Sequence, residues 1–158
     1  MSTETFHAIK NLLDEHSITY REVHHEPTPT SAEAAKARGE DISIGGKAIL
    51  LKVGKVFNLF VLSAALKVDS ARIKAHFKAK KLRFASAEEL LDLTGLVPGS
   101  VPPFGTPLLP FPLFADRSIG QNEHIAFNAG SLTDSIVMDV EDYLKIASPT
   151  VFDFSIPD

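Results

Sequence analysis

The fold follows from one stretch of sequence, Lys47-Ala-Ile-Leu-Leu-Lys-Val53, then Gly54, then Lys55-Val-Phe-Asn-Leu-Phe-Val-Leu62. Two apolar runs separated by a glycine turn predict a buried antiparallel hairpin. Each run has the length of an ordinary strand. Because both runs are apolar, we expect the hairpin to be buried at the centre of a sheet.

Helical patterns flank this hairpin. Apolar residues at helical spacing predict an amphipathic helix over 4–16. Thr30-Ser-Ala-Glu33 and Ser86-Ala-Glu-Glu89 have the form of capping boxes, and their helices end at Gly39 and near Gly95. Further helices are expected from Asp69 or Ser70 to Phe77 and over about 140–147, the latter capped by Asp139, and further strands over 19–23, 82–85, 125–128 and 135–138.

Strands grouped around hairpins, with helices scattered between them, predict one mixed α/β or α+β domain over residues 1–158. Residues 97–113 contain six of the chain's ten prolines. Prolines at this density are incompatible with a helix interior or a central strand, so we expect an ordered, irregular loop that leads into an edge strand. The pattern assigns no element to the tail after Pro149.

Composition narrows the function classes. The chain is 44% hydrophobic, enough for one core, and its formal net charge of −4 restricts any nucleic-acid contact to a local patch. Because the chain has no cysteine, a disulfide framework, a thiolate zinc site and a cysteine nucleophile are excluded. The polar N-terminus does not resemble a signal peptide, and no apolar run is long enough to cross a membrane. We therefore expect a cytoplasmic protein.

Lys47 and the loop Gly99-Ser-Val-Pro-Pro-Phe-Gly105 are the first candidates for chemistry. A lysine at the start of a central strand can project into a cleft and hold a phosphate or an ester carbonyl, although a solvated strand end is the more common role. A loop stiffened by proline can present backbone N–H groups to an anion or a polarised carbonyl. It can equally serve as a rigid connector, and both interpretations remain open.

Two further turns offer polar side chains. Asn128-Ala-Gly-Ser131 separates two strands and can line a pocket or simply form a hairpin turn. Asp116 follows an apolar strand, a position where an aspartate more often forms a turn than takes part in catalysis. The six histidines show no metal-ligand spacing, and the chain has no Gly-x-Ser-x-Gly elbow, Walker loop or dinucleotide fingerprint. We therefore expect no metal and no cofactor.

Basic residues are concentrated between residues 67 and 83, a segment that contains seven lysines and arginines but only one acidic residue, Asp69. Such a segment fits a phosphate backbone as well as a solvated helix face, and the sequence does not choose between them. For tRNA binding the candidates within it are Lys74, Lys78, Lys80 and Lys81.

The order of these segments resembles the YbaK/prolyl-tRNA-synthetase-associated domain family. The resemblance covers roughly residues 20–147. It rests on the segment from Thr30 to Gly39, the strand that begins with Lys47, the segment from Lys81 to Glu89, the run Thr94-Gly-Leu-Val-Pro-Gly-Ser-Val-Pro-Pro-Phe-Gly105 and the turn Phe127-Asn-Ala-Gly-Ser131. It implies a mixed, mostly antiparallel, barrel-like sheet surrounded by helices. It also implies a trans-editing hydrolase that deacylates mischarged tRNA, typically alanyl- or cysteinyl-tRNA for proline, without a metal.

The resemblance matches the family's lysine to Lys47 and its loop to Gly99, Ser100, Val101, Pro102 and Pro103, which are therefore the expected catalytic residues. Alanine-specific members often carry Asn after the lysine and His in the later strand, whereas this chain has Ala48 and Asn128. Serine, threonine or another small amino acid is therefore an alternative substrate. The residues expected to bind substrate are Thr30, Ala48, Phe104, Gly105, Asp116, Asn128, Gly130 and Ser131.

Two other functions remain open from the sequence. The basic segment also fits a non-catalytic tRNA or oligonucleotide binder. A third possibility is an interaction module that docks on an aminoacyl-tRNA synthetase. A binder slows the loss of amino acid from tRNA, whereas an editing enzyme accelerates it.

Overall fold

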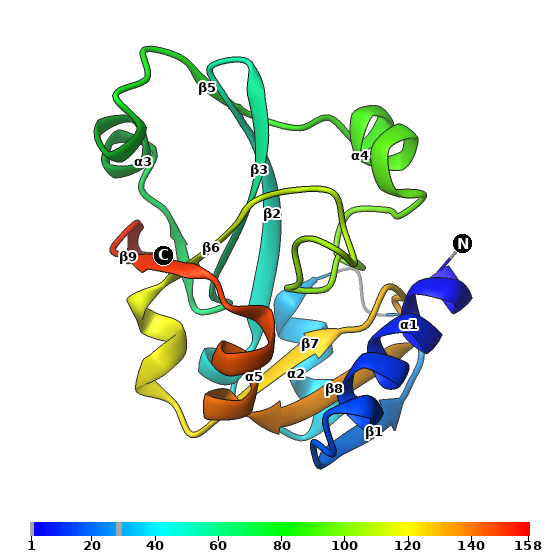
Figure 1. Ribbon diagram of the computed structural model, residues 1–158. Coiled ribbons are helices and arrows are strands. Elements are labelled where there is room, and N and C mark those ends of the chain that lie inside the picture. The colour runs from blue at the N-terminus through cyan, green and yellow to red at the C-terminus, as the bar shows by residue number, and fades with distance from the viewer. Residues whose placement is uncertain (1, 28–29) are drawn as a thin grey trace.

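The computed structural model describes residues 2–27 and 30–158, and Figure 1 shows their arrangement. The described strands form a five-stranded, a three-stranded and a two-stranded sheet. The helices are α1 (Ser2–Glu15), α2 (Ser31–Arg38), α3 (Ser70–Phe77), α4 (Ala87–Thr94) and α5 (Val140–Ala147), with two short 3₁₀ turns at Ile42–Ile44 and Arg117–Gln121. The strands are β1 (Tyr20–His24), β2 (Gly46–Val53), β3 (Val56–Ser63), β4 (Leu66–Val68), β5 (Leu82–Phe84), β6 (Leu113–Asp116), β7 (His124–Asn128), β8 (Asp134–Asp139), β9 (Thr150–Phe152) and β10 (Ser155–Pro157).

The predicted hairpin is confirmed and lies at the centre of the largest sheet. Strands β2 and β3 pair antiparallel along their whole length, and Gly54 makes the turn between them in the left-handed region, with φ of 61°. The sheet order is β5-β2-β3-β6-β9. One face of the hairpin contributes Leu50, Leu59 and Val61 to the larger core, and the other contributes residues such as Leu51 and Phe60 to a second core.

The loop that was expected to lead into an edge strand leads instead into an interior one. Strand β6 pairs in parallel with β3 on one side and with β9 on the other. Pro112, the last proline of the loop, lies just before β6, so the N–H groups of Leu113–Asp116 remain available for pairing. The edge is β9, which comes from the tail that the sequence left unassigned.

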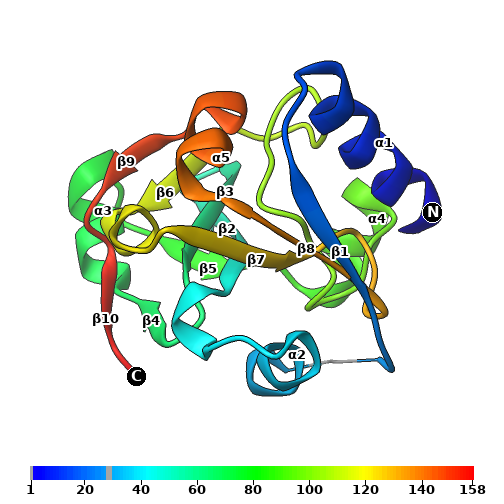
Figure 2. The same cartoon turned by 90° about the horizontal axis from the view of Figure 1, so that it is seen from below.

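The three-stranded sheet, in the order β1-β8-β7, separates two layers of helices. Figures 1 and 2 show α1 and α5 on one face of it and α2 on the other. Alternate residues of β7 follow this division, because successive side chains of a strand point to opposite faces. Ile125 and Phe127 enter the core, whereas Asn128 faces Arg38 of α2.

The mixed α/β fold is confirmed, and the antiparallel pairings outnumber the parallel ones. Its barrel-like character is not confirmed, because none of the sheets formed by the described strands closes on itself. The three-stranded sheet meets the chain just before β2 through a single bridge between Gly45 and Ala126. This contact brings β7 next to the start of β2.

Helix termini follow the capping predictions with one exception. Ser86 and Glu89 form a complete capping box, and Gly39 and Gly95 adopt left-handed caps. Thr30 accepts from the backbone N–H of Glu33. Asp139 occupies the N-cap position of α5, but its side chain makes no capping hydrogen bond there and lies 3.3 Å from Nε2 of His124.

None of the described helices combines the length and apolar character that crossing a bilayer requires.

Candidate active site

A cavity opens where the start of β2, the end of β7, helix α2 and the proline loop meet. It encloses about 480 Å³ of empty space, including its open mouth. Most of its wall is made of alanine, glycine and small polar side chains, and two cations complete it. The lining residues are Thr30, Ser31, Ala34, Arg38, Gly45, Gly46, Lys47, Ala48, Ala64, Gly99, Val101, Ala126 and Asn128.

The cavity brings Lys47 together with the loop that begins at Gly99, although 52 positions separate them in the sequence. Lys47 is half-buried at the start of β2. Burial lowers the pKa of its ammonium group, while the charge of Asp158 opposes this change. Among the described residues, no carboxylate forms an ion pair with Lys47 within 4 Å, and a partly desolvated ammonium group of this kind is suited to bind an anionic or polarised oxygen.

Three carbonyl groups of the proline loop accept hydrogen bonds from outside it. The Asn128 side chain donates to the Gly99 carbonyl at 2.7 Å, and the Gly130 backbone donates to the Ser100 carbonyl at 2.9 Å. The Tyr143 hydroxyl, fully buried beneath the loop, donates to the Pro103 carbonyl at 2.6 Å, and burial raises its pKa. These contacts fix the orientation of successive peptide planes.

The fixed planes decide which N–H groups remain available. Because a peptide unit is planar and trans, the Val101 N–H points away from the Ser100 carbonyl, which Gly130 holds. The Ser100 N–H donates to the carbonyl of Val97 at 3.1 Å, whereas the N–H groups of Gly99 and Val101 donate to no described residue. Pro102 and Pro103 have no backbone N–H, so they do not contribute donors.

Two consecutive glycines allow the cavity walls to approach closely. A Cβ atom at Gly45 would lie 2.9 Å from Cβ of Ala64, and one at Gly46 would lie 2.6 Å from Cδ1 of Ile125. Distances below 3.0 Å require a shift of the surroundings, so a larger residue at 45 would displace Ala64 and one at 46 would push β2 away from β7.

Arg38 is a member of the site that the sequence prediction missed. The residue is only 8% exposed, and its guanidinium donates from Nε to Ser135 Oγ at 3.0 Å and from Nη2 to Asn128 Oδ1 at 3.1 Å. Burial lowers its pKa to about 10. A signal was available, because Arg38 lies four residues after Ala34, on the face of α2 that packs inward.

Several predicted substrate-binding residues lie away from this cavity. Phe104 is a core residue whose ring contacts those of Phe127 and Tyr143. Gly105 permits the close approach of the Phe111 carbonyl. Ser131 bonds locally with Thr133. Gly130 serves the site only through its backbone. Of the predicted catalytic residues, Ser100, Pro102 and Pro103 are buried in the loop without lining the cavity.

Asp116 also lies elsewhere. Its carboxylate accepts from the backbone N–H groups of Ser118 and Phe154 and from the hydroxyl of Ser155. Burial raises its pKa, but these hydrogen bonds outweigh burial and leave the pKa below its usual value. Asp116 therefore anchors the C-terminal segment to β6.

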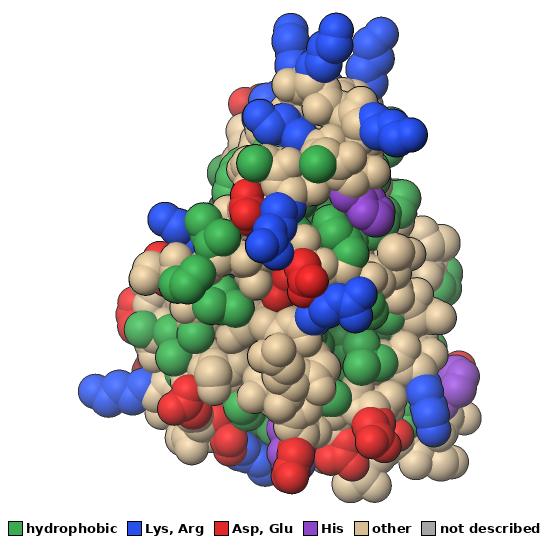
Figure 3. Space-filling view, turned by 90° about the vertical axis from the view of Figure 1, so that its left-hand side faces the viewer, with side chains coloured by type: hydrophobic (Ala, Val, Ile, Leu, Met, Phe, Trp, Pro, Cys, Tyr) green, Lys and Arg blue, Asp and Glu red, His purple; other side chains and the backbone are tan. Residues whose placement is uncertain are grey.

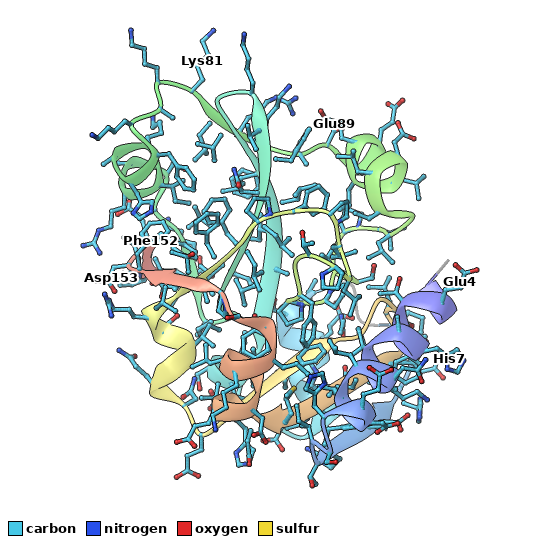
Figure 4. All side chains as sticks on the ribbon, viewed as in Figure 1. Glu4, His7, Lys81, Glu89, Phe152 and Asp153 are labelled. Carbon is cyan, nitrogen blue, oxygen red and sulfur yellow. The ribbon has the colours of Figure 1, made fainter. Side chains whose placement is uncertain are left out.

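The basic segment forms a surface at the far end of β2. The Gly54 backbone donates to the Lys81 carbonyl at 2.9 Å, which places the hairpin turn next to the segment. Figure 3 shows Lys and Arg side chains gathered at this end of the molecule, and Figure 4 shows Lys81 pointing away from it. The exposed lysines there, which we call the lysine ridge, are Lys55, Lys78, Lys80 and Lys81. Lys74 lies on α3 and is half-buried.

Among the described residues, no three histidine, aspartate or glutamate side chains form a group that could hold a metal ion. The described lining of the cavity offers two cations, backbone amides, the Asn128 side chain and the hydroxyl groups of Thr30 and Ser31.

Comparison with known proteins identifies the family. The model of the aminoacyl-tRNA editing domain matches residues 25–146. The multifunctional Ser/Thr-tRNA deacylase ProXp-y of Escherichia coli K12 is 33% identical over 151 residues, which cover 90% of this chain and 88% of that protein. A proline–tRNA ligase of Shouchella clausii is 36% identical over 100 residues, 63% of this chain but 17% of the ligase.

A solved structure shares the fold. It belongs to a protein proposed to be a trans-editing enzyme for prolyl-tRNA synthetase, and it superposes with a TM-score of 0.82 at 23% identity, covering 96% of this chain and 97% of the other. The family match spans the cavity, the proline loop and the lysine ridge. The chain belongs to the aminoacyl-tRNA editing domain family.

Proposed function

We propose that this protein removes serine, threonine or another small amino acid from mischarged tRNA. It is a trans-editing aminoacyl-tRNA deacylase, a hydrolase that cleaves the ester between the amino acid and the terminal ribose. The observation that carries the proposal is the convergence of Lys47, the Gly99–Val101 backbone and Asn128 on one small cavity.

In the proposed reaction, water attacks the ester carbonyl and the ribose oxygen leaves with a proton, which yields free amino acid and tRNA. Negative charge develops on the carbonyl oxygen as the water adds. The Val101 N–H, which donates to no described residue, is our candidate donor to this oxygen, and the Lys47 ammonium group stabilises the same charge or the adjacent ribose oxygens. An aminoacyl ester is already activated, so placement and charge stabilisation are sufficient help.

None of the described residues that line the cavity is an aspartate, glutamate or histidine. We therefore propose that the substrate activates its own water, through its free hydroxyl or amino group.

The cavity wall supports a small and polar amino acid. Ala48, Ala64 and Ala126 leave space for a short side chain, while Thr30 and Asn128 offer hydrogen-bonding groups to a hydroxyl. The name of the Escherichia coli relative supports serine and threonine in particular. Because one methylene changes discrimination by only about 1–3 kcal/mol, we expect serine and threonine, which differ by one carbon, to be hydrolysed at comparable rates.

The lysine ridge is the proposed contact for the tRNA backbone, together with Lys74. Because the same domain occurs within proline–tRNA ligases, we propose an aminoacyl-tRNA synthetase as a further partner. We also propose that residues 1–158 act as one editing domain. The segments outside the family match support this view, since α1 contributes Phe6, Ile9 and Leu13 to the core and β9 completes the large sheet.

A deacylation screen tests the proposal. Purified protein is mixed with tRNAs carrying serine, threonine, alanine, cysteine or proline, and the loss of each amino acid is followed against buffer. We expect faster loss of serine or threonine and no effect of Lys47→Ala protein. Slower loss than in buffer would instead identify a non-catalytic tRNA binder.

A further inference from the structure

We propose that Arg38 is a positioning residue for the reaction, which holds the Asn128 side chain so that it fixes the Gly99 end of the proline loop. The inference rests on the proposed function and adds a residue that acts without touching the reacting atoms.

Arg38 is buried in an unusual setting for a cation. Among the described residues no carboxylate pairs with its guanidinium, and its hydrogen-bond partners are the neutral groups Ser135 Oγ and Asn128 Oδ1. Desolvating a charge without a counter-ion is costly, so a smaller or apolar residue would fill this position at lower cost to stability. What the guanidinium provides instead is two donors at fixed angles.

Those donors decide which way the Asn128 amide faces. A carboxamide has an oxygen on one side and an NH₂ group on the other, and the two ends have nearly the same shape. The Arg38 guanidinium and the Ser135 hydroxyl both donate to Oδ1, the latter at 3.0 Å, so the oxygen must face them. The NH₂ group therefore faces the Gly99 carbonyl, to which it donates at 2.7 Å.

The opposite orientation is unfavourable at both ends. It would direct the NH₂ group of Asn128 at the Arg38 donors and its oxygen at the Gly99 carbonyl oxygen. Without Arg38 this preference weakens, because the Ser135 hydroxyl has a single proton and also contacts Nε2 of His25 at 2.8 Å.

The effect of Arg38 reaches the loop amides through the backbone. The bond to the Gly99 carbonyl fixes the peptide plane between Gly99 and Ser100, and the next plane carries the Val101 N–H. An amide donor that is displaced or mobile stabilises the developing charge less well, and a displacement of about 1 Å can lower the rate about 100-fold. We therefore expect a loss in kcat rather than in substrate binding.

A double-mutant cycle tests this coupling. Arg38→Lys keeps the charge but replaces the rigid two-donor group by a flexible one, and Asn128→Ala removes the amide. Each variant and the double variant are assayed for kcat and KM on the mischarged tRNA that the wild-type protein hydrolyses fastest. We expect Arg38→Lys to lower kcat about 10- to 100-fold with KM changed less than about threefold. The double variant should then be no slower than Asn128→Ala alone.

A second measurement does not depend on turnover. Amide ¹H–¹⁵N resonances of Gly99, Ser100 and Val101 should shift in Arg38→Lys and remain unchanged in the matched control Arg21→Lys, which alters an exposed ion pair with Glu40. Thermal unfolding of each variant shows that it is folded. Multiplicative losses in the cycle, or unchanged loop resonances in Arg38→Lys, would overturn the inference. If the wild-type protein hydrolyses no mischarged tRNA, the proposed function itself is refuted. This result is obtained with the wild-type protein alone and is therefore distinct from a failure of the Arg38 inference.

Discussion

Lys47 and Lys81 lie near opposite ends of strand β2, since Lys47 lines the cavity and the Lys81 carbonyl accepts from Gly54 at the hairpin turn. The seven residue-to-residue steps from Lys47 to Gly54 span roughly 23 Å of extended chain. A ligand that reaches both must be at least this long, which fits a tRNA whose aminoacyl end occupies the cavity. The two lysine groups should therefore affect different kinetic constants.

Charge reversal on the lysine ridge should weaken tRNA binding and leave the chemical step intact. We expect Lys78→Glu with Lys81→Glu to raise KM at low salt and to reduce the slope of log affinity against log salt by about 2, because each lost phosphate contact removes close to one unit. Binding titrations between 50 and 200 mM salt, together with kcat measured at saturation, check this expectation.

The matched control for the ridge variant is Lys10→Glu with Lys145→Glu. It changes the net charge of the protein by the same amount, but on helices α1 and α5. If the control flattens the salt dependence as much as the ridge variant, the effect belongs to overall charge. An unaltered slope in the ridge variant would identify the ridge as a solvated surface.

Lys47→Met should abolish deacylation and stabilise the fold. Burial lowers the pKa of Lys47, so its charged form is less favourable in the folded than in the unfolded protein. The charge therefore opposes folding at neutral pH, and this cost disappears as the pH rises above the ordinary pKa of 10.5. We expect a higher Tm for Lys47→Met at pH 7 and a smaller difference from wild type near pH 10. Equal or lower stability at pH 7 would contradict this assignment.

Much of the fold and part of the site could be predicted because the signals were local. The hairpin, the Ser86 capping box and the glycine caps each depend on residues close in sequence. Lys47 and Asn128 were found because each stands at the end of a predicted strand. Arg38 was missed because its partners, Asn128 and Ser135, lie 90 and 97 positions away.

The C-terminal strands show the same limit. Strands β9 and β10 contain three residues each, too few for a periodic pattern. They are held by pairing with β6 and β4 and by Asp116, which lies 38 positions before Phe154. Neither relationship leaves a trace in the local sequence.

Gly46→Ala should destabilise the protein by about 1–3 kcal/mol, because its Cβ atom would overlap Cδ1 of the fully packed Ile125. The Cγ1 atom of Ile125 would also lie only 2.8 Å from the new Cβ atom, so relief of the overlap requires the loss of both atoms. The double variant Gly46→Ala with Ile125→Ala should therefore be less destabilised than the two single variants together. Denaturant unfolding of the four proteins measures this coupling. Strict additivity would show that Gly46 is needed for another reason.

Asp116→Asn should lower stability at neutral pH and leave the chemistry of the folded protein unchanged. The substitution replaces one carboxylate oxygen by an NH₂ group that faces N–H or O–H donors, at a cost of about 2–3 kcal/mol. Hydrogen bonding holds the pKa of Asp116 below its ordinary value of 3.8, so the carboxylate stabilises the fold above pH 3.8.

That stabilisation is lost as the pH falls from 3.8 through the lower pKa of the folded state. The difference in unfolding free energy between wild type and Asp116→Asn should therefore be largest near pH 7 and should shrink below pH 4. Asp153→Asn is the matched control, because its exposed ion pair with Arg117 contributes little. A kcat/KM that falls in folded Asp116→Asn protein would return Asp116 to the substrate-binding residues. An unchanged value would confine it to anchoring the C-terminal strands, since its carboxylate is already occupied by Ser118, Phe154 and Ser155.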